Sequence, residues 1–393
     1  MSETAPPPGS RLGNLPWLLL PTALILAVVA WVVLTDPLKN LGSDAPPVEG
    51  LTVERTILDD DGLRLLVRAG GSEPMVIAQI QVDSAYWQFV QDPPGPISRG
   101  SSAWLKLPFP WMLGEAHTIT LVTNTGATFE HAIEVAVPTP KPSAGQLRQQ
   151  ALVGLFVGVL PVVLGLMFYP ALRNVRPQGM NFLLALTVGL LLFLLIDTLE
   201  EAFSLAAESA VIFQGPMMVM LAALSSFLLL MAVSHRHSAP GGLALATFIS
   251  LGIGLHNFGE GLAIGAAFAT GSAGLGTFLI MGFALHNITE GIGIAAPILS
   301  KRPPLWVFAA LALLAGGPAV IGMWMGSLAF AAHWAALALA IGAGAILQVV
   351  VQVCLYLMRL NKAGIETLFS RSVLSGFLVG LAVMYATATL IKI

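Results

Sequence analysis

The sequence predicts a polytopic α-helical membrane protein that carries one N-terminal transmembrane anchor and a small all-β, sandwich-like outer domain. Of its 393 residues, 56% are hydrophobic and only 10% are charged. Soluble domains usually contain about 25% charged residues, so this chain has too few to cover several water-facing surfaces. The second observation is a series of long apolar runs, and the third is one polar stretch with a strand-like pattern.

Apolar runs long enough to cross a membrane occur nine times. A transmembrane helix needs about 20 apolar residues to cross roughly 30 Å of hydrocarbon. The runs cover residues 15–34, 151–172, 180–199, 211–234, 241–268, 275–299, 305–330, 334–358 and 373–391. We therefore predict an anchor followed, after the polar stretch, by eight helices in residues 150–393.

The first run is predicted to be an uncleaved anchor at residues 15–35, preceded by a cytoplasmic N-terminus at residues 1–14. A secretory signal peptide has an apolar region of only about 7–15 residues and a small-residue cleavage site. This run is longer, and no clear site of that kind follows it.

The polar stretch at residues 45–138 is predicted to form the β-domain. Polar and apolar residues alternate at residues 51–57 and 117–123, and turn-forming residues lie at 59–62, 69–72 and 124–126. Such alternation between turns is typical of short antiparallel strands. Proline-rich segments flank the stretch, and residues 139–149 are predicted to form a linker to the helices.

Orientation follows from the positive charges in the short loops. The loops after the second, fourth, sixth and eighth runs contain Lys or Arg, whereas those after the third, fifth and seventh contain neither. Lys and Arg accumulate on the cytoplasmic side of membrane proteins. The pattern predicts a cytoplasmic N-terminus, with the β-domain and the C-terminus outside. A β-domain without cysteine is compatible with a bacterial periplasm, which favours the bacterial inner (plasma) membrane.

Composition also limits the chemistry. A formal net charge of -3 excludes the strongly basic surface of nucleic-acid-binding proteins. A single cysteine allows neither an intramolecular disulfide nor a thiolate metal cluster, so any metal site must use nitrogen and oxygen ligands.

Two carboxylates lie deep inside apolar runs. Glu260 and Glu290 occupy the fifth and sixth runs, and the runs after the β-domain contain no Lys or Arg. A carboxylate at such depth must be protonated, hydrated or bound to metal, and it marks a functional site by default.

Each glutamate belongs to a repeated motif, Leu255-His-Asn-Phe-Gly-Glu-Gly261 and Leu285-His-Asn-Ile-Thr-Glu-Gly291. The four-residue spacing places each His and Glu on one helical face. The predicted ligands are His256, Glu260, His286 and Glu290, with Asn257 and Asn287 as possible carbonyl donors. This set suits zinc, iron(II) or manganese. Gly261 and Gly291, the last residues of the two motifs, allow the helices that carry them to approach other helices closely. A single buried His is more often a structural residue than a metal ligand. Two copies of the His-Asn-x-x-Glu-Gly motif in adjacent helices are hard to explain by packing alone.

The duplicated motif resembles the paired signature of the ZIP family of divalent metal transporters, in its fourth and fifth core helices. The resemblance covers roughly residues 150–393. It implies an eight-helix core with both ends outside, a homodimer without enzymatic activity or a resident cofactor, and movement of divalent metal into the cytoplasm. Zinc is the expected cargo, with iron(II), manganese, cobalt and cadmium as other candidates. It implies no role or binding partner for the β-domain.

The resemblance also implies residue roles. His256, Glu260, His286 and Glu290 match the transport-site ligands, and Asn257 and Asn287 match positions associated with a second metal. Asp197 falls roughly where the family's second core helix often supplies a ligand on the path from the outer side of the membrane to the metal site. It equally fits a helix-end residue at the outer interface. Gly317 stands where many bacterial members carry a bridging Glu, which predicts one transported metal rather than two.

Two other functions compete with transport. An intramembrane zinc hydrolase needs a metal-bound water and a general base, as in His-Glu-x-x-His, but Asn257 follows His256 here and no second His lies four residues later. A metal-binding receptor or sensor would hold a structural ion in the membrane while the β-domain engages a partner.

Overall fold

The computed structural model describes residues 15–35, 48–139, 143–235, 242–269, 273–329, 331–360 and 364–391. The chain divides into two compact units, Met1–Pro47 and Val48–Ile393. The predicted cytoplasmic N-terminus, residues 1–14, lies outside the described residues.

The described part of the first unit is helix α1 (Leu15–Thr35). The helix has 21 residues, and nearly all of them are apolar. The helix agrees with the predicted anchor in position and character, while its membrane insertion stays a prediction.

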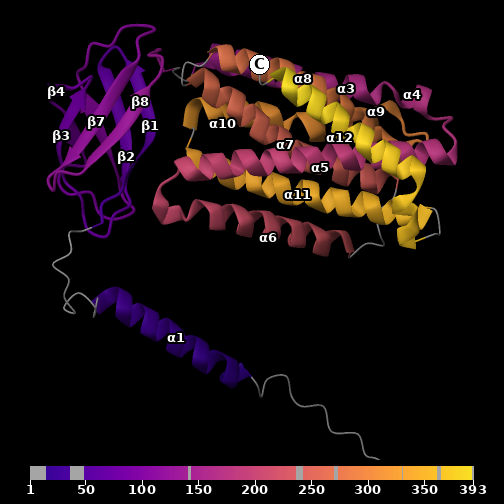
Figure 1. The fold of residues 1–393 in the computed structure, drawn as a ribbon, viewed down its shortest axis with the longest axis horizontal. Helices are drawn as coiled ribbons and strands as arrows, with labels where there is room; N and C mark the ends of the chain where they lie inside the picture. The colour runs from indigo at the N-terminus through magenta and orange to yellow at the C-terminus, as the bar shows by residue number, and fades with distance from the viewer. Residues whose placement is uncertain are drawn as a thin grey trace, which may run out of the picture. The chain divides into compact units, whose positions relative to one another are not determined.

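The β-domain consists of two four-stranded antiparallel sheets (Figure 1), which confirms the predicted two-sheet architecture. The first contains, in spatial order, β1 (Leu51–Asp59), β2 (Gly62–Ala69), β6 (Ser102–Leu107) and β5 (Val90–Asp92). The second contains β4 (Ala85–Trp87), β3 (Ile77–Val82), β7 (His117–Thr123) and β8 (Thr128–Ile133).

Alternation along the strands builds the core of this domain. Leu63, Leu65 and Val67 of β2 are fully buried, as are Ile119 and Leu121 of β7. Successive side chains of a strand point to opposite faces, so every second apolar residue turns inward. The tight turn between β1 and β2 ends at Gly62, whose φ of +117° favours glycine.

The chain after the β-domain is helical. Its α-helices are α2 (Ala144–Gly154), α3 (Leu160–Leu166), α4 (Tyr169–Leu172), α5 (Pro177–Glu208), α6 (Gly215–His235), α7 (Leu243–Ala269), α8 (Ala273–Ala295), α9 (Leu305–Gly316), α10 (Pro318–Ala329), α11 (Ala332–Leu360) and α12 (Arg371–Ile391). A π-helical turn, Leu155–Val159, joins α2 to α3, and short 3₁₀ turns lie at Val211–Phe213, Ala296–Ile298 and Gly364–Phe369. The long helices lie side by side in one bundle (Figure 1).

Six helical segments among the described residues are long and apolar enough to cross a membrane. They are Ala144–Leu172, Pro177–Glu208, Val211–Ser234, Leu305–Leu328, Ala332–Leu360 and Arg371–Thr389. They indicate a multi-pass membrane protein. Helices α7 and α8, which carry the polar His, Asn and Glu of the repeated motif, are not among these six segments of the described residues. The predicted eight-helix core therefore stays a prediction.

Helix boundaries differ from the predicted runs in three places. Helix α5 continues to Glu208, so Asp197 is not a helix-end residue, and that interpretation was wrong. Helix α2 begins inside the predicted linker, because the Ser143 side chain accepts a hydrogen bond from the Gln146 backbone at 3.2 Å and caps it. The seventh run is divided into α9 and α10 at Pro318, which has no backbone N–H to continue the helical hydrogen bonds.

Glycines bring the motif-bearing helices close to their neighbours, as predicted. A Cβ on Gly261 of α7 would lie 2.1 Å from the Ala319 carbonyl oxygen of α10. A Cβ on Gly291 of α8 would lie 2.3 Å from the Val162 carbonyl oxygen of α3. Only hydrogen fits at these positions, so α7 packs closely against the backbone of α10, and α8 against the backbone of α3.

Candidate metal centre

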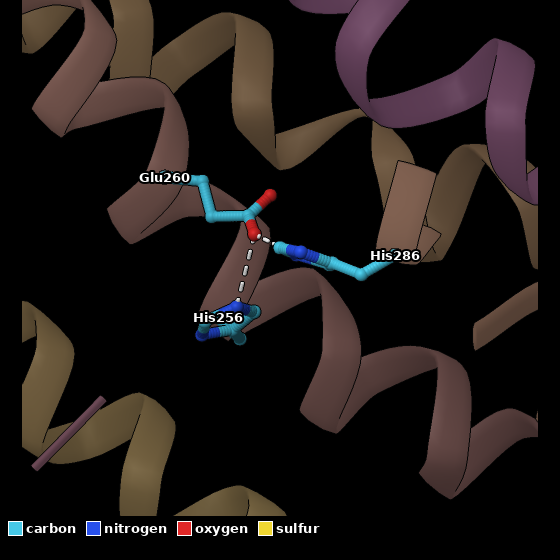
Figure 2. A group of neighbouring side chains, drawn as sticks. All are labelled: His256, Glu260 and His286. Carbon is cyan, nitrogen blue, oxygen red and sulfur yellow. Dashed lines mark hydrogen bonds and ion pairs between the residues drawn. The ribbon is translucent and has the colours of Figure 1, made fainter. Parts of the chain in front are cut away.

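Three of the predicted ligands converge between two neighbouring helices. His256 and Glu260 lie one turn apart on α7, and His286 comes from α8 (Figure 2). One ligand atom from each of the three lies within 4.8 Å of the others. The four-residue spacing within α7 predicted the shared face of His256 and Glu260, and the packing of α8 beside it supplies the third group.

Glu260 lies at the centre of this group. Its Oε1 atom is 3.1 Å from Nε2 of His256 and also hydrogen-bonds to Nε2 of His286. Figure 2 shows both rings turned toward the same carboxylate. Two imidazole nitrogens and one carboxylate oxygen thus point at a common centre, which is the donor set expected around a divalent transition metal.

Water is largely excluded from the group. His256, Glu260 and His286 are exposed by only 3%, 2% and 6%, respectively. Among the described residues, the ion pairs of Glu260 are with the two histidines alone. A buried carboxylate is costly unless a positive charge balances it. Either a protonated imidazole or a bound cation meets that requirement here.

Of the two asparagines in the motifs, Asn287 hydrogen-bonds to the group and Asn257 to a neighbouring helix. The Asn287 amide donates to Oε2 of Glu260 at 3.2 Å and to the Val157 carbonyl at 3.1 Å. The Asn257 amide donates to the Ala315 carbonyl at 3.1 Å, in the last turn of α9 before Pro318. In the described part of the chain, the Oδ1 atoms of both asparagines are buried without a hydrogen-bond partner. These oxygens remain available as acceptors.

Glu290, the fourth predicted ligand, is not part of the three-residue group formed by the described residues. It lies on α8 one turn after His286 and is only 4% exposed. Neither of its carboxylate oxygens has a hydrogen-bond partner among the described residues. It borders a cavity of about 10 Å³, lined mainly by apolar side chains such as Ile253 and Met384, which has room for about one water. Its role as a ligand stays a prediction.

Asp197 is partly buried on α5 and is also outside the group. It lies close enough to His256 to interact with it electrostatically. The residue after it, Thr198, is fully buried and makes direct contact, with its Oγ1 atom 2.8 Å from Nδ1 of His256. The sequence interpretation missed Thr198, because a threonine in an apolar helix normally satisfies its hydroxyl within its own helix.

In comparisons with known proteins, no protein-family model and no curated protein matches this chain.

Proposed function

We propose that this chain is a multi-pass membrane carrier of divalent transition metal ions. Zinc is the first candidate cargo, followed by iron(II), manganese, cobalt and cadmium. The observation that supports the proposal is the convergence of His256, Glu260 and His286 on one buried centre between α7 and α8. The resemblance of the two motifs to those of the ZIP family favours the same function.

The donor set favours transition metals over magnesium and calcium. Imidazole nitrogen suits zinc, iron, copper and nickel, whereas magnesium and calcium prefer oxygen ligands alone. Three protein ligands leave coordination positions open for water or a further ligand, as in zinc sites that exchange what they bind. Glu290 and the Asn257 and Asn287 carbonyl oxygens are the candidates for those positions.

Transport requires that the ion enter and leave this centre. The ion arrives from the outer side, exchanges water for the three side chains, and leaves to the cytoplasm after a conformational change. Metal displaces protons from the imidazoles, so uptake depends on pH. By the resemblance, α7 and α8 move as a rigid pair in a homodimer.

The proposed orientation places the N-terminus in the cytoplasm and the β-domain and C-terminus outside the bacterial inner membrane. The alternating Lys and Arg content of the loops supports this arrangement.

Zinc uptake into proteoliposomes tests the proposal. The full chain is compared with Glu260→Gln, which keeps the size of the side chain but removes its charge. Glu366→Gln is the matched control, because Glu366 is exposed and belongs to the 3₁₀ turn before α12. We expect saturable uptake by the wild type and the control, and its loss in Glu260→Gln. Undiminished uptake by Glu260→Gln would sink the assignment.

The same experiment separates the alternatives. Iron(II), manganese, cobalt and cadmium are added as competitors to rank the cargo. Zinc that binds tightly without flux would favour the receptor or the hydrolase over a carrier.

A further inference from the structure

Thr198 connects a third helix to the candidate metal centre. It lies on α5, is fully buried, and has two close polar neighbours. Its Oγ1 atom is 2.7 Å from the Leu194 carbonyl oxygen and 2.8 Å from Nδ1 of His256. The first contact is within α5 and the second crosses to α7.

The chemistry of these contacts determines which atom donates each hydrogen bond. A hydroxyl has one proton to donate, and a backbone carbonyl can only accept. The Thr198 hydroxyl therefore donates to Leu194, and its oxygen accepts from His256. For that, Nδ1 of His256 must carry a proton.

A proton on Nδ1 decides what the other ring nitrogen can do. In a neutral imidazole only one nitrogen is protonated, so the lone pair then lies on Nε2. Nε2 is the atom that faces Glu260 at 3.1 Å, in the group shared with His286. Without the Thr198 oxygen, the remaining side-chain hydrogen bond of His256 among the described residues, to Glu260, would not oppose the other tautomer, in which Nε2–H donates to Glu260 and has no lone pair for a metal.

We propose that Thr198 is a positioning residue that holds His256 in the Nδ1–H tautomer and so presents Nε2 to a divalent transition metal ion. This inference rests on the proposed function, because it requires that the centre bind metal. Partners that orient a ligating histidine typically change metal affinity by about 10–100-fold when they are removed.

Zinc binding by the purified full chain, with Thr198→Val and Thr198→Ser beside the wild type, is the first measurement. Valine has the shape of threonine without the hydroxyl, and serine keeps the hydroxyl. We expect zinc affinity to fall by about 10–100-fold in Thr198→Val and to stay within about threefold in Thr198→Ser. Thr387→Val on α12 is the control, since Thr387 donates to its own helix at Val383 in the same way.

A second readout detects the tautomer itself. Nitrogen NMR of ¹⁵N-histidine-labelled, zinc-loaded protein shows which ring nitrogen of His256 carries the proton and which one binds the metal. We expect Nδ1–H with zinc on Nε2 in the wild type and in Thr198→Ser, and a mixture that includes Nε2–H in Thr198→Val. A merely structural threonine would not change this signal.

The outcomes distinguish this inference from the proposed function. Wild-type zinc affinity in Thr198→Val, or weakened binding with an unchanged tautomer, would overturn the role of Thr198. If the wild type binds no zinc, the proposed function and this inference both fail. Zinc binding without flux would refute transport and leave Thr198 in its assigned role.

Discussion

Replacing Gly261 by alanine tests whether close packing of α7 against α10 sets the geometry of the metal centre. Gly261 directly follows Glu260, and its Cα faces the backbone of α10. An added Cβ would lie 2.1 Å from the Ala319 carbonyl oxygen and 2.8 Å from the Ala319 carbonyl carbon. These are backbone atoms, which cannot rotate away as a side chain can.

The expected cost follows from those distances. Ordinary contact begins at 3.4 Å, so the two helices must separate by about 1 Å. Overpacking of this kind costs about 1–3 kcal/mol, against a gain of at most about 1 kcal/mol for replacing glycine within a helix. A displacement of 1 Å at a reacting centre can lower a rate by about 100-fold. We expect lower thermal stability together with strongly reduced zinc uptake.

Thermal unfolding in detergent and proteoliposome uptake measure these two effects. Gly252→Ala on the same helix is the matched control, because its Cβ would first meet the Val349 Cγ2 atom at 3.0 Å, so that neighbour must move by only a few tenths of an ångström. The reasoning is refuted if Gly261→Ala is as stable and as active as Gly252→Ala.

Three further predictions concern the site and the β-domain. Asn287→Ala should lower zinc affinity by about 10–100-fold in calorimetry, since its amide holds Oε2 of Glu260; unchanged affinity would contradict that role. Leu121→Ala should destabilise the β-domain by about 2–5 kcal/mol, because Leu121 is fully buried; unchanged hydrogen exchange in β3 and β7 would argue against this core. Burial lowers the pKa of His131 below its ordinary 6.5, so the unfolded chain binds this proton more readily than the folded domain. The His131 contribution to stability should be complete above about pH 6.5 and decline as pH falls through the folded-state pKa. Hydrogen exchange in β8, corrected for its intrinsic pH dependence, should show this decline, and His131→Gln should remove it.

Local patterns predicted much of this fold because they depend on neighbouring residues. Alternation at residues 51–57 and 117–123 marked strands β1 and β7. Alternate side chains of β7 are buried in the core, and Leu51 and Val53 of β1 pack against it partly buried. The spacing of His256 and Glu260 marked one face of α7, because residues four apart lie one above the other on a helix. Neither inference needed knowledge of a distant segment.

Other features depended on contacts between helices. The partnership of Thr198 with His256 joins residues 58 positions apart, and no local pattern in α5 marks it. Glu290 has the same motif spacing as Glu260, yet it lies outside the three-residue group of the described chain. The two repeats are alike in sequence, but different neighbours surround them.

The sequence by itself determined that long apolar helices follow a β-domain, and that each of two such helices carries a His and a Glu on one face. Only the tertiary structure decided which of those side chains meet. The physical reason is that helical periodicity sets the direction of a side chain on its own helix, whereas packing sets the distance between helices. Here Gly261 and Gly291 set that packing by letting α7 and α8 approach the backbones of α10 and α3.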